Sequence, residues 1–409
     1  MKETMFITKT LFEGKEENST AVLLGKNDNS FDMQGILKKN QAPTIVLYSR
    51  EKISIDVSNN LLQDDGFINI LNEFKKTLNE LPADKTYILI ASEDFYALLL
   101  SLSKDDLNEN IVHLTPSSEV VLACYNKIAF SELCSKFGIA APLSQVISTI
   151  SQIHTSALPT PGIIKPHING AIPKSIVDKV AIIYDQPQLI DIASKIIATG
   201  QIVFYQEFIP GRSSDIFFVS GFFDFKNNNS KLFTGIKLTE FPSTGGVACH
   251  AKIIENEAVM EKALIFLNKT EYQGLVDIEY KIDSRTNEII MIETNPRIGL
   301  QHKISTSKSG DVISFYYHTL CNRSEKTNYT LPPSGSKWIR PEKHICSTIE
   351  KKGLIVGIST TIIDLIGAKT VSSIDLTDFA RTVQHLKNII GFTRKLSLKT
   401  LIFGNHNNS

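Results

Sequence analysis

Short, continuously apolar segments alternate with helical patterns through the first third of the chain. We expect strands at residues 21–25, 44–48, 87–91 and 111–114, and a helix at residues 31–39. Strands that are apolar on both faces are typical of a parallel sheet covered by helices on each side, and the helices between them supply the crossover connections. The alternation therefore predicts an N-terminal parallel α/β domain, which we place at residues 1–124.

The length and the charge balance narrow the class of protein. A chain of 409 residues exceeds what one hydrophobic core usually serves, so we expect two or three domains. Its 43 basic and 43 acidic residues cancel, which disfavours a nucleic-acid binder that relies on bulk charge. No apolar run approaches the roughly 20 residues that span a bilayer, and the N-terminal segment lacks the apolar block of a signal peptide. These features predict a soluble cytoplasmic protein with neither nucleic-acid nor membrane partners.

The cysteines do not indicate a structural role for sulfur. They are Cys124, Cys134, Cys249, Cys321 and Cys346. Their number is odd and no pair has C-x-x-C spacing, so the pattern supports neither a disulfide framework nor a zinc site. Cys249 and His250 are adjacent, but consecutive strand residues point to opposite faces. We interpret them as a packed pair rather than as metal ligands.

From residue 125 the pattern changes to helices and strands that do not alternate regularly. We expect helices at residues 126–137, 186–199, 259–268 and 378–390, and strands at residues 163–165, 203–209, 215–225 and 232–238. Gly138 follows the first of these helices, where glycine commonly ends a helix. Irregularly mixed helices and strands predict an α+β organisation for this part.

The segment 274–297 carries the strongest indication of function. Two runs of alternating apolar and polar residues flank a turn at 284–288, which is typical of a β-hairpin. We expect one face of the first run to carry Leu275, Asp277, Glu279 and Lys281, and one face of the second to carry Ile289, Met291, Glu293 and Asn295. Pairing Asp283 with Ile289 places Glu279 opposite Glu293 and Asp277 opposite Asn295, although a slip of one residue would change the partners.

Two carboxylates that face each other across a strand pair repel. A divalent cation removes the repulsion, and two carboxylates with an amide oxygen are the hard oxygen donors that suit Mg²⁺. Glu279, Glu293 and Asn295 are therefore candidate metal ligands, and Arg297 follows where it can reach a neighbouring anion. The alternative, a solvent-exposed acidic face on an edge hairpin, stays open at this point.

Other residues upstream of the hairpin fit a nucleotide site. Lys165 ends an apolar strand and Lys127 opens a helix, although lysines in such places are commonly at a rim or on the surface. Residues 206–211 form an apolar strand that runs into a Pro-Gly turn, and the backbone of such a linker can bind an adenine edge. Asp215 follows where it could meet a ribose, or could simply cap the turn.

In this order and spacing, the segments resemble the ATP-grasp superfamily over about residues 125–315. The matching segments are Asn126-Lys127, Ile163-Ile164-Lys165-Pro166, Gln206-Glu207-Phe208-Ile209-Pro210-Gly211, and Glu279 with Ile292-Glu293-Thr294-Asn295-Pro296-Arg297. The resemblance implies a two-subdomain ATP-grasp fold after the N-terminal domain. It places a central lid subdomain at 125–205, a C-terminal subdomain with the Mg-ATP site at 206–330, and a C-terminal extension at 331–409.

The resemblance also implies roles for individual residues. The ATP-binding residues would be Lys127, Lys165, Gln206, Glu207, Ile209, Asp215 and Lys237. The metal ligands would be Glu279, Glu293 and Asn295, holding one or two Mg²⁺ ions, with Mn²⁺ as a substitute. Lys165 and Arg297 would be catalytic, through contact with the transferred phosphoryl group. Two positions depart from the family pattern: Asn126 stands where aspartate is common, and the phosphate loop at 167–175 has one glycine.

The activity implied by the resemblance is an ATP-dependent, ADP-forming carboxylate–amine ligase that works through an acyl phosphate. Its substrates would be an amino acid or small carboxylate and an amine, and the layout is most similar to the amino-acid ligases typified by D-aspartate ligase. We keep three alternatives: carboxylation through carboxyphosphate as in biotin carboxylases, a nucleotide-binding module without catalysis, and an unrelated protein with a chance hairpin. Assembly as a homodimer is also left open.

Overall fold

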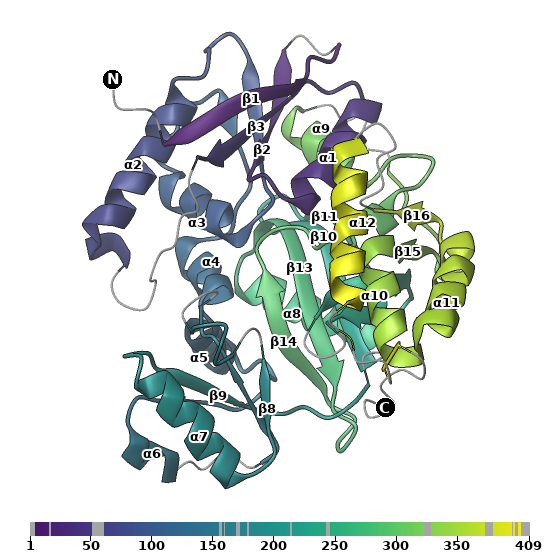
Figure 1. Cartoon of the computed structure of the whole chain (residues 1–409). Coiled ribbons are helices and arrows are strands. Elements are labelled where there is room, and N and C mark those ends of the chain that lie inside the picture. The colour runs from purple at the N-terminus through teal and green to yellow at the C-terminus, as the bar shows by residue number, and fades with distance from the viewer. Residues whose placement is uncertain are drawn as a thin grey trace.

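The computed structural model describes residues 5–15, 18–50, 61–154, 158, 160–168, 172–177, 180–212, 215–242, 246–322, 329–372, 379–394, 396 and 400–401. Within these residues the strands form three sheets of five, four and seven strands. In Figure 1 the five-stranded sheet lies at the top, the four-stranded sheet at the bottom and the seven-stranded sheet between them. The predicted fold class, a parallel-sheet domain followed by a two-part α+β region, is confirmed.

The N-terminal sheet contains all four predicted strands. They are β2 (Ser19–Leu24), β3 (Thr44–Ser49), β4 (Thr86–Ala91) and β5 (Ile111–Val112), which pair in parallel. A strand that the apolar pattern did not reveal, β1 (Phe6–Phe12), pairs antiparallel with β3 at the edge. Most of its residues are at least partly exposed, so it lacks the continuous apolar run that marks a strand covered on both faces.

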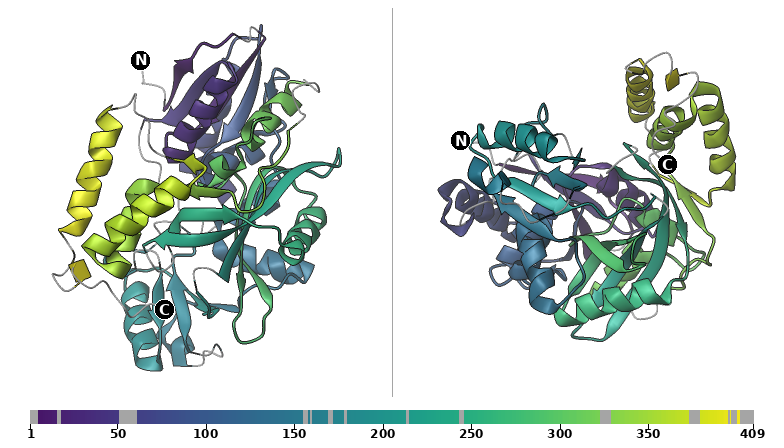
Figure 2. Two further views of the ribbon diagram at one scale, coloured as in Figure 1. Left: turned by 90° about the vertical axis from the view of Figure 1, so that its right-hand side faces the viewer. Right: turned by 90° about the horizontal axis from the view of Figure 1, so that it is seen from below.

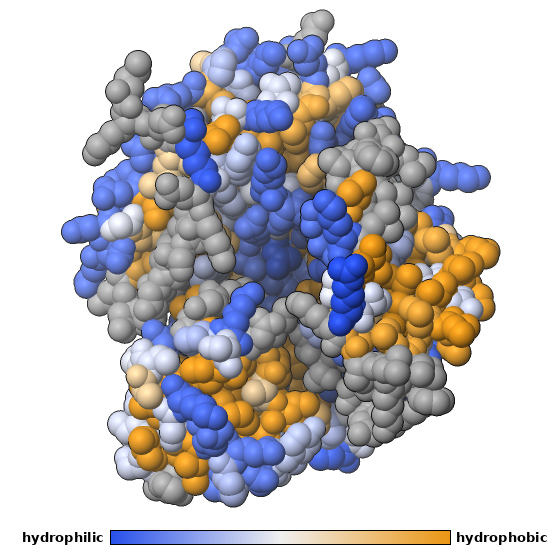
Figure 3. All heavy atoms as spheres, viewed as in Figure 1, coloured by the Kyte–Doolittle hydropathy of each residue, from blue (hydrophilic) through white to orange (hydrophobic). Residues whose placement is uncertain are grey.

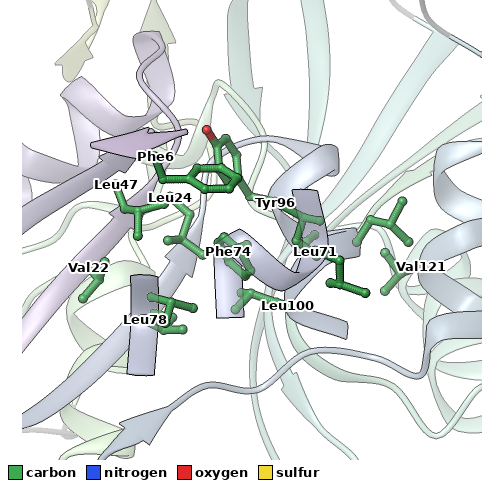
Figure 4. Packing of buried hydrophobic residues seen from close by; sticks show 14 of the residues in the cluster. Phe6, Val22, Leu24, Leu47, Leu71, Phe74, Leu78, Tyr96, Leu100 and Val121 are labelled. Carbon is green, nitrogen blue, oxygen red and sulfur yellow. The ribbon is translucent and has the colours of Figure 1, made fainter. Parts of the chain in front are cut away.

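Helices cover both faces of this sheet, as the apolar strands require. The helices are α1 (Asp28–Lys39), α2 (Asp65–Asn79), α3 (Asp94–Ser103) and α4 (Ser118–Tyr125), with a short 3₁₀ helix, η1 (Leu61–Gln63), before α2. Successive strand residues point to opposite sides, so Leu24 packs with α2 and α3, whereas Leu23 packs with α1. Figure 4 shows Phe6 and Tyr96 gathered around Phe74 on the first side; the Phe6 and Phe74 ring centroids are 5.6 Å apart.

The four-stranded sheet forms a small separate layer. Its antiparallel order is β6 (Ser144–Ile147), β9 (Val203–Glu207), β7 (Gly162–Lys165) and β8 (Ala181–Ile183), with helices α6 (Ile150–His154) and α7 (Gln186–Ile197). Helix α5 (Lys127–Phe137) leads into it from α4. The Asn126 side chain caps the start of α5, and Gly138 ends it with a φ of 62°. The predicted helix boundaries are therefore confirmed here.

The seven-stranded sheet contains the predicted hairpin at one edge. Its order is β14 (Ile289–Asn295), β13 (Gln273–Ile282), β10 (Ile216–Asp224), β11 (Asn229–Phe241), β12 (Val247–Ile253), β15 (Lys337–Ile339) and β16 (Thr370–Val371). Neighbours are antiparallel except for β15 and β16. Helix α8 (Glu257–Lys269) buries Phe266 and Leu267 against one face of β13, whose other face carries the candidate metal ligands.

Further helices follow the hairpin. They are η3 (His302–Ser305), α9 (Val312–Leu320), α10 (Pro341–Lys352), α11 (Leu354–Gly367) and α12 (Phe379–Thr393). Helix α9 packs against the N-terminal domain, whereas α10 to α12 lie together on one side of the molecule (Figure 2). Residue 378, the predicted start of the last helix, lies outside the described residues. The domain boundaries predicted at residues 124, 205 and 330 are not tested by these observations, so they stay a prediction. In the described part of the chain, no helix has the length and apolarity that crossing a membrane requires.

Candidate active site

The predicted pairing of acidic residues across the hairpin is confirmed. Glu279 lies opposite Glu293, and Asp277 lies opposite Asn295. Nearer the turn, however, the predicted pairing of Asp283 with Ile289 was wrong, because Ile289 pairs with Ile282 instead. A β-bulge between Glu279 and Tyr280 on one strand, and Glu293 and Met291 on the other, shifts the register by one residue.

The bulge also changes which residues share a face. Met291 pairs with Tyr280, and both side chains lie in the apolar core against α8. Glu293 pairs with Glu279 on the opposite face, so the expectation that Met291 and Glu293 share a face was wrong. Bulges commonly re-aim a side chain next to an active site. Here the bulge lets β14 carry core residues at one end and oxygen donors at the other.

Lys237 provides a fixed positive charge beside the oxygen donors. Its Nζ atom on β11 reaches across β10 and donates to Glu279 Oε2 at 2.6 Å, with 4% of the Lys237 side chain exposed. Burial alone would lower the pKa of Lys237, but the neighbouring Glu279 carboxylate raises it above its ordinary value. Lys237 therefore stays charged before any ligand binds.

Four cations act electrostatically on Glu293. Enclosure by protein atoms would raise the pKa of its carboxyl, but nearby positive charges outweigh this effect and lower it. These charges belong to Lys127, Lys165, Lys237 and Arg297. The four predicted cations thus all influence one predicted metal ligand, although they come from four different segments of the chain.

Asp277 is a site residue that sequence reasoning left out of the ligand set. It is buried beside Glu279, and its Oδ1 accepts a hydrogen bond from Gln301 Nε2 at 2.8 Å. Burial, followed by the Glu279 charge, raises the pKa of Asp277 to about 7. The sequence did carry a signal for it, because Asp277 and Glu279 are two residues apart and so share a strand face.

Arg297 connects the hairpin to the N-terminal domain. Its Nε and Nη2 atoms bind the two carboxylate oxygens of Asp94 at 2.9 and 3.1 Å, and Nη2 also donates to Asn295 Oδ1 at 3.1 Å. Asp94 begins α3, and it was missed because it lies 203 residues before Arg297 in the chain. Arg297 therefore holds the end of β14 against α3, and its expected contact with a phosphoryl group stays a prediction.

The molecule is hollowed on the face that Figure 3 shows. Figure 3 shows a depression in the centre of this face whose floor is hydrophilic, between the part of the molecule with β1 to β5 and the part with β6 to β9. A hydrophilic depression of this kind can hold a polar or charged ligand.

The chain was compared with known proteins by sequence and by structure. No family model matches the chain. A D-aspartate ligase from Enterococcus faecium (strain Aus0004) is 24% identical over 309 residues, which make up 70% of this chain and 72% of that protein. The crystal structure of phosphoribosylglycinamide synthetase from Anaerococcus prevotii has a TM-score of 0.53 at 14% identity, covering 78% of this chain and 80% of that one. The biotin carboxylase domain of 2-oxoglutarate carboxylase from Hydrogenobacter thermophilus, in complex with MgADP, ADP and bicarbonate, has a TM-score of 0.54 at 12% identity, covering 79% and 74%.

The chain has the ATP-grasp fold of these structures. The four-stranded sheet and the helix that leads into it carry two of the predicted lysines. Lys165 ends β7, and Lys127 begins α5, where its backbone N–H donates to His167 O at 3.0 Å. Burial, followed by repulsion from Lys127, lowers the pKa of Lys165 to about 7. Of the predicted phosphate loop, positions 169–171 lie outside the described residues.

The residues expected at the adenine and ribose have mixed surroundings. Gln206 and Ile209 are buried at the end of β9, whereas Glu207 Oε1 pairs with Arg285 Nη2 at 2.6 Å. Asp215 Oδ2 accepts a hydrogen bond from the Arg212 backbone N–H at 2.6 Å. The turn cap, the alternative reading of Asp215, is thus present, and contacts of these residues with a nucleotide stay predictions.

Proposed function

We propose that this ATP-grasp protein is an ADP-forming ligase that joins a carboxylate to an amine. The observation that carries the proposal is the pairing of Glu279 with Glu293 on one face of the hairpin, with four cations around Glu293. This arrangement complements a metal-bound triphosphate, whose negative charge the lysines offset and whose metal the carboxylates ligate. An exposed acidic face, the alternative left open above, does not account for Lys237 buried against Glu279.

The donor set fits a magnesium site. Glu279 and Glu293 offer carboxylate oxygens and Asn295 offers an amide oxygen, all at one end of a strand pair. Hard oxygen donors of this kind suit one or two Mg²⁺ ions or Mn²⁺, with remaining positions left for water and phosphate oxygens. When bound, the metal would neutralise charge on the transferred phosphoryl group.

The residues of this chain would then position the nucleotide and protect the reaction. Lys127 and Lys165, whose charges act on Glu293, would bind the phosphates. Gln206, Glu207 and Ile209 would hold the adenine, and Asp215 the ribose. Lys237 orients Glu279 through its hydrogen bond. Closure of the smaller subdomain would exclude water, which otherwise hydrolyses an activated acid.

The proposed chemistry needs no protein nucleophile. A carboxylate oxygen of the substrate attacks the γ-phosphorus, and the bond to the β–γ bridging oxygen breaks to release ADP. The amine then attacks the carbonyl carbon of the acyl phosphate, which releases inorganic phosphate and forms a C–N bond. Arg297 and Lys165 are the cations that we expect to stabilise the phosphoryl group during the first step.

A screen of ADP and phosphate release tests this proposal. The purified chain is incubated with Mg-ATP and pooled amino acids and small carboxylates, and products are identified by mass spectrometry. We expect release that depends on both an acid and an amine, and none from Glu293→Gln. The similarity to D-aspartate ligase makes D-amino acids the first acids to include. Tight ATP binding without ADP release across the panel would instead favour a non-catalytic module.

Carboxylation through carboxyphosphate is the second candidate. Its support is the similarity to a biotin carboxylase domain that was crystallised with bicarbonate. ADP release that requires bicarbonate, and persists without a carboxylate substrate, would identify this chemistry.

Two properties of the whole protein accompany the proposal. We expect a cytoplasmic location, which cell fractionation tests. We also keep the homodimer as a prediction, which light scattering on the purified chain tests.

A further inference from the structure

A second cluster of ligating side chains lies away from the nucleotide site. It consists of His250 on β12, His344 on α10 and Asp364 on α11. One ligand atom from each residue lies within 4.8 Å of the others. His344 Nε2 is 3.0 Å from Asp364 Oδ2, and His250 Nδ1 is 3.7 Å from the same oxygen.

The spacing is that of ligands around a metal ion. Tetrahedral zinc has bonds of about 2.0–2.1 Å to nitrogen and oxygen, which place its ligand atoms about 3.3 Å apart. The two measured distances to Asp364 lie on either side of this value. The two imidazole rings meet edge to face, with centroids 5.0 Å apart. Asp364 is partly exposed, which leaves room for water as a fourth ligand.

Hydrogen bonding alone does not account for the cluster. A bond from His344 to Asp364 explains the 3.0 Å contact, but 3.7 Å is too long for a second one from His250. His250 is buried, and among the described residues its Nε2 has no hydrogen-bond partner. The nitrogen of His250 that faces Asp364 is Nδ1, and a cation bound between the two side chains would give this buried nitrogen a partner.

The surroundings of His344 resemble the outer shell of a metal site. Its Nδ1 lies 2.8 Å from Thr239 Oγ1, which lies 3.2 Å from Cys249 Sγ. A metal at Nε2 would require Nδ1–H to donate to Thr239, and such partners orient ligating histidines.

We propose that His250, His344 and Asp364 bind one zinc ion that connects β12 to α10 and α11. The site is separate from the nucleotide site. Lys237 pairs with Ala251, and Thr239 pairs with His250. Because consecutive residues of β12 point to opposite faces, His250 lies on the face of the sheet opposite Lys237. The ion therefore has a structural role: it holds the C-terminal helices against the sheet.

Zinc binding to the full-length chain tests the proposal. The protein is stripped with a chelator, and Zn²⁺ is titrated in competition with a chromophoric chelator. We expect one ion per chain. Asp364→Asn and His250→Gln should each weaken binding by about 100-fold or more, and Thr239→Val by about 10–100-fold. His113→Gln, a histidine in the N-terminal sheet, is the matched control and should bind as the wild type does. Unchanged affinity in Asp364→Asn would overturn the assignment.

A second measurement does not depend on whether the variants fold. A ligand that binds the native state raises the temperature of unfolding. Zn²⁺ should raise the unfolding midpoint of the stripped wild-type chain, whereas Mg²⁺ at the same concentration should not reproduce the increase. No increase with Zn²⁺ would contradict the proposal. Neither experiment contains nucleotide, so their outcome is independent of the proposed ligase activity.

Discussion

The protonation state of Lys165 leads to a prediction about ATP binding. In the free protein, burial and repulsion from Lys127 lower the pKa of Lys165 to about 7, compared with 10.5 for an unperturbed lysine. At about pH 8, roughly nine-tenths of Lys165 is therefore neutral before ATP binds. A triphosphate beside the amine favours its charged form and raises the pKa again. Binding of Mg-ATP should then be accompanied by uptake of about 0.8–0.9 proton at this pH.

The sign of the pH dependence follows from this linkage. Because the ATP-bound state holds the additional proton, affinity is highest below the pKa of the free protein and falls as the pH rises through it. We expect the dissociation constant for Mg-ATP to rise by about tenfold per pH unit above about pH 7.5. The fall should end near the higher pKa of the bound state.

Calorimetry in buffers of different ionisation enthalpy measures the proton uptake directly. Lys165→Met should bind Mg-ATP more weakly, without proton uptake and with little dependence on pH. Lys136→Met is the control, since Lys136 is an exposed lysine paired with Glu119 on the outside of the molecule. An uptake near zero in the wild type, or an equal uptake in Lys165→Met, would refute the reasoning.

Three further predictions concern the hairpin. Glu293→Gln should abolish turnover while the circular dichroism spectrum and unfolding midpoint stay unchanged, because a metal ligand is lost without a change of shape; wild-type rates would contradict the metal assignment. Lys237→Met should lower the free energy of unfolding by about 2–3 kcal/mol, since it leaves the mostly buried Glu279 unpaired. In urea unfolding, the double variant Lys237→Met/Glu279→Gln should lose less free energy of unfolding than the sum of the losses in the two single variants. Additivity to within about 0.5 kcal/mol would argue against coupling of the pair. Gly299→Ala would place a methyl group 2.4 Å from Asp277 Oδ2 and so displace this carboxylate beside Glu279. The Mg²⁺ concentration that supports half-maximal turnover should therefore rise. An unchanged Mg²⁺ dependence would contradict this prediction.

Much of the architecture could be predicted because it depends on local patterns. The apolar runs of β2, β3 and β4 required cover on both faces, and the helices that provide it are present. The alternation in β13 and β14 correctly placed Glu279 opposite Glu293. The β-bulge between β13 and β14 was not predictable from that alternation. A strict period of two carries Met291 and Glu293 on one face, and only packing of Met291 against α8 separates them.

Contacts between distant segments depended on tertiary structure. Residue types and spacing identified Lys237, Glu279 and Arg297 as candidates without showing what they touch. Lys237 meets Glu279 only because β10 lies between β11 and β13 and brings together residues 42 positions apart. Asp94 reaches Arg297, and His250 reaches Asp364, through packing of whole helices against strands. Turn length and side-chain periodicity act over a few residues and can be read from the chain, whereas sheet order and helix packing are settled by the burial of entire surfaces.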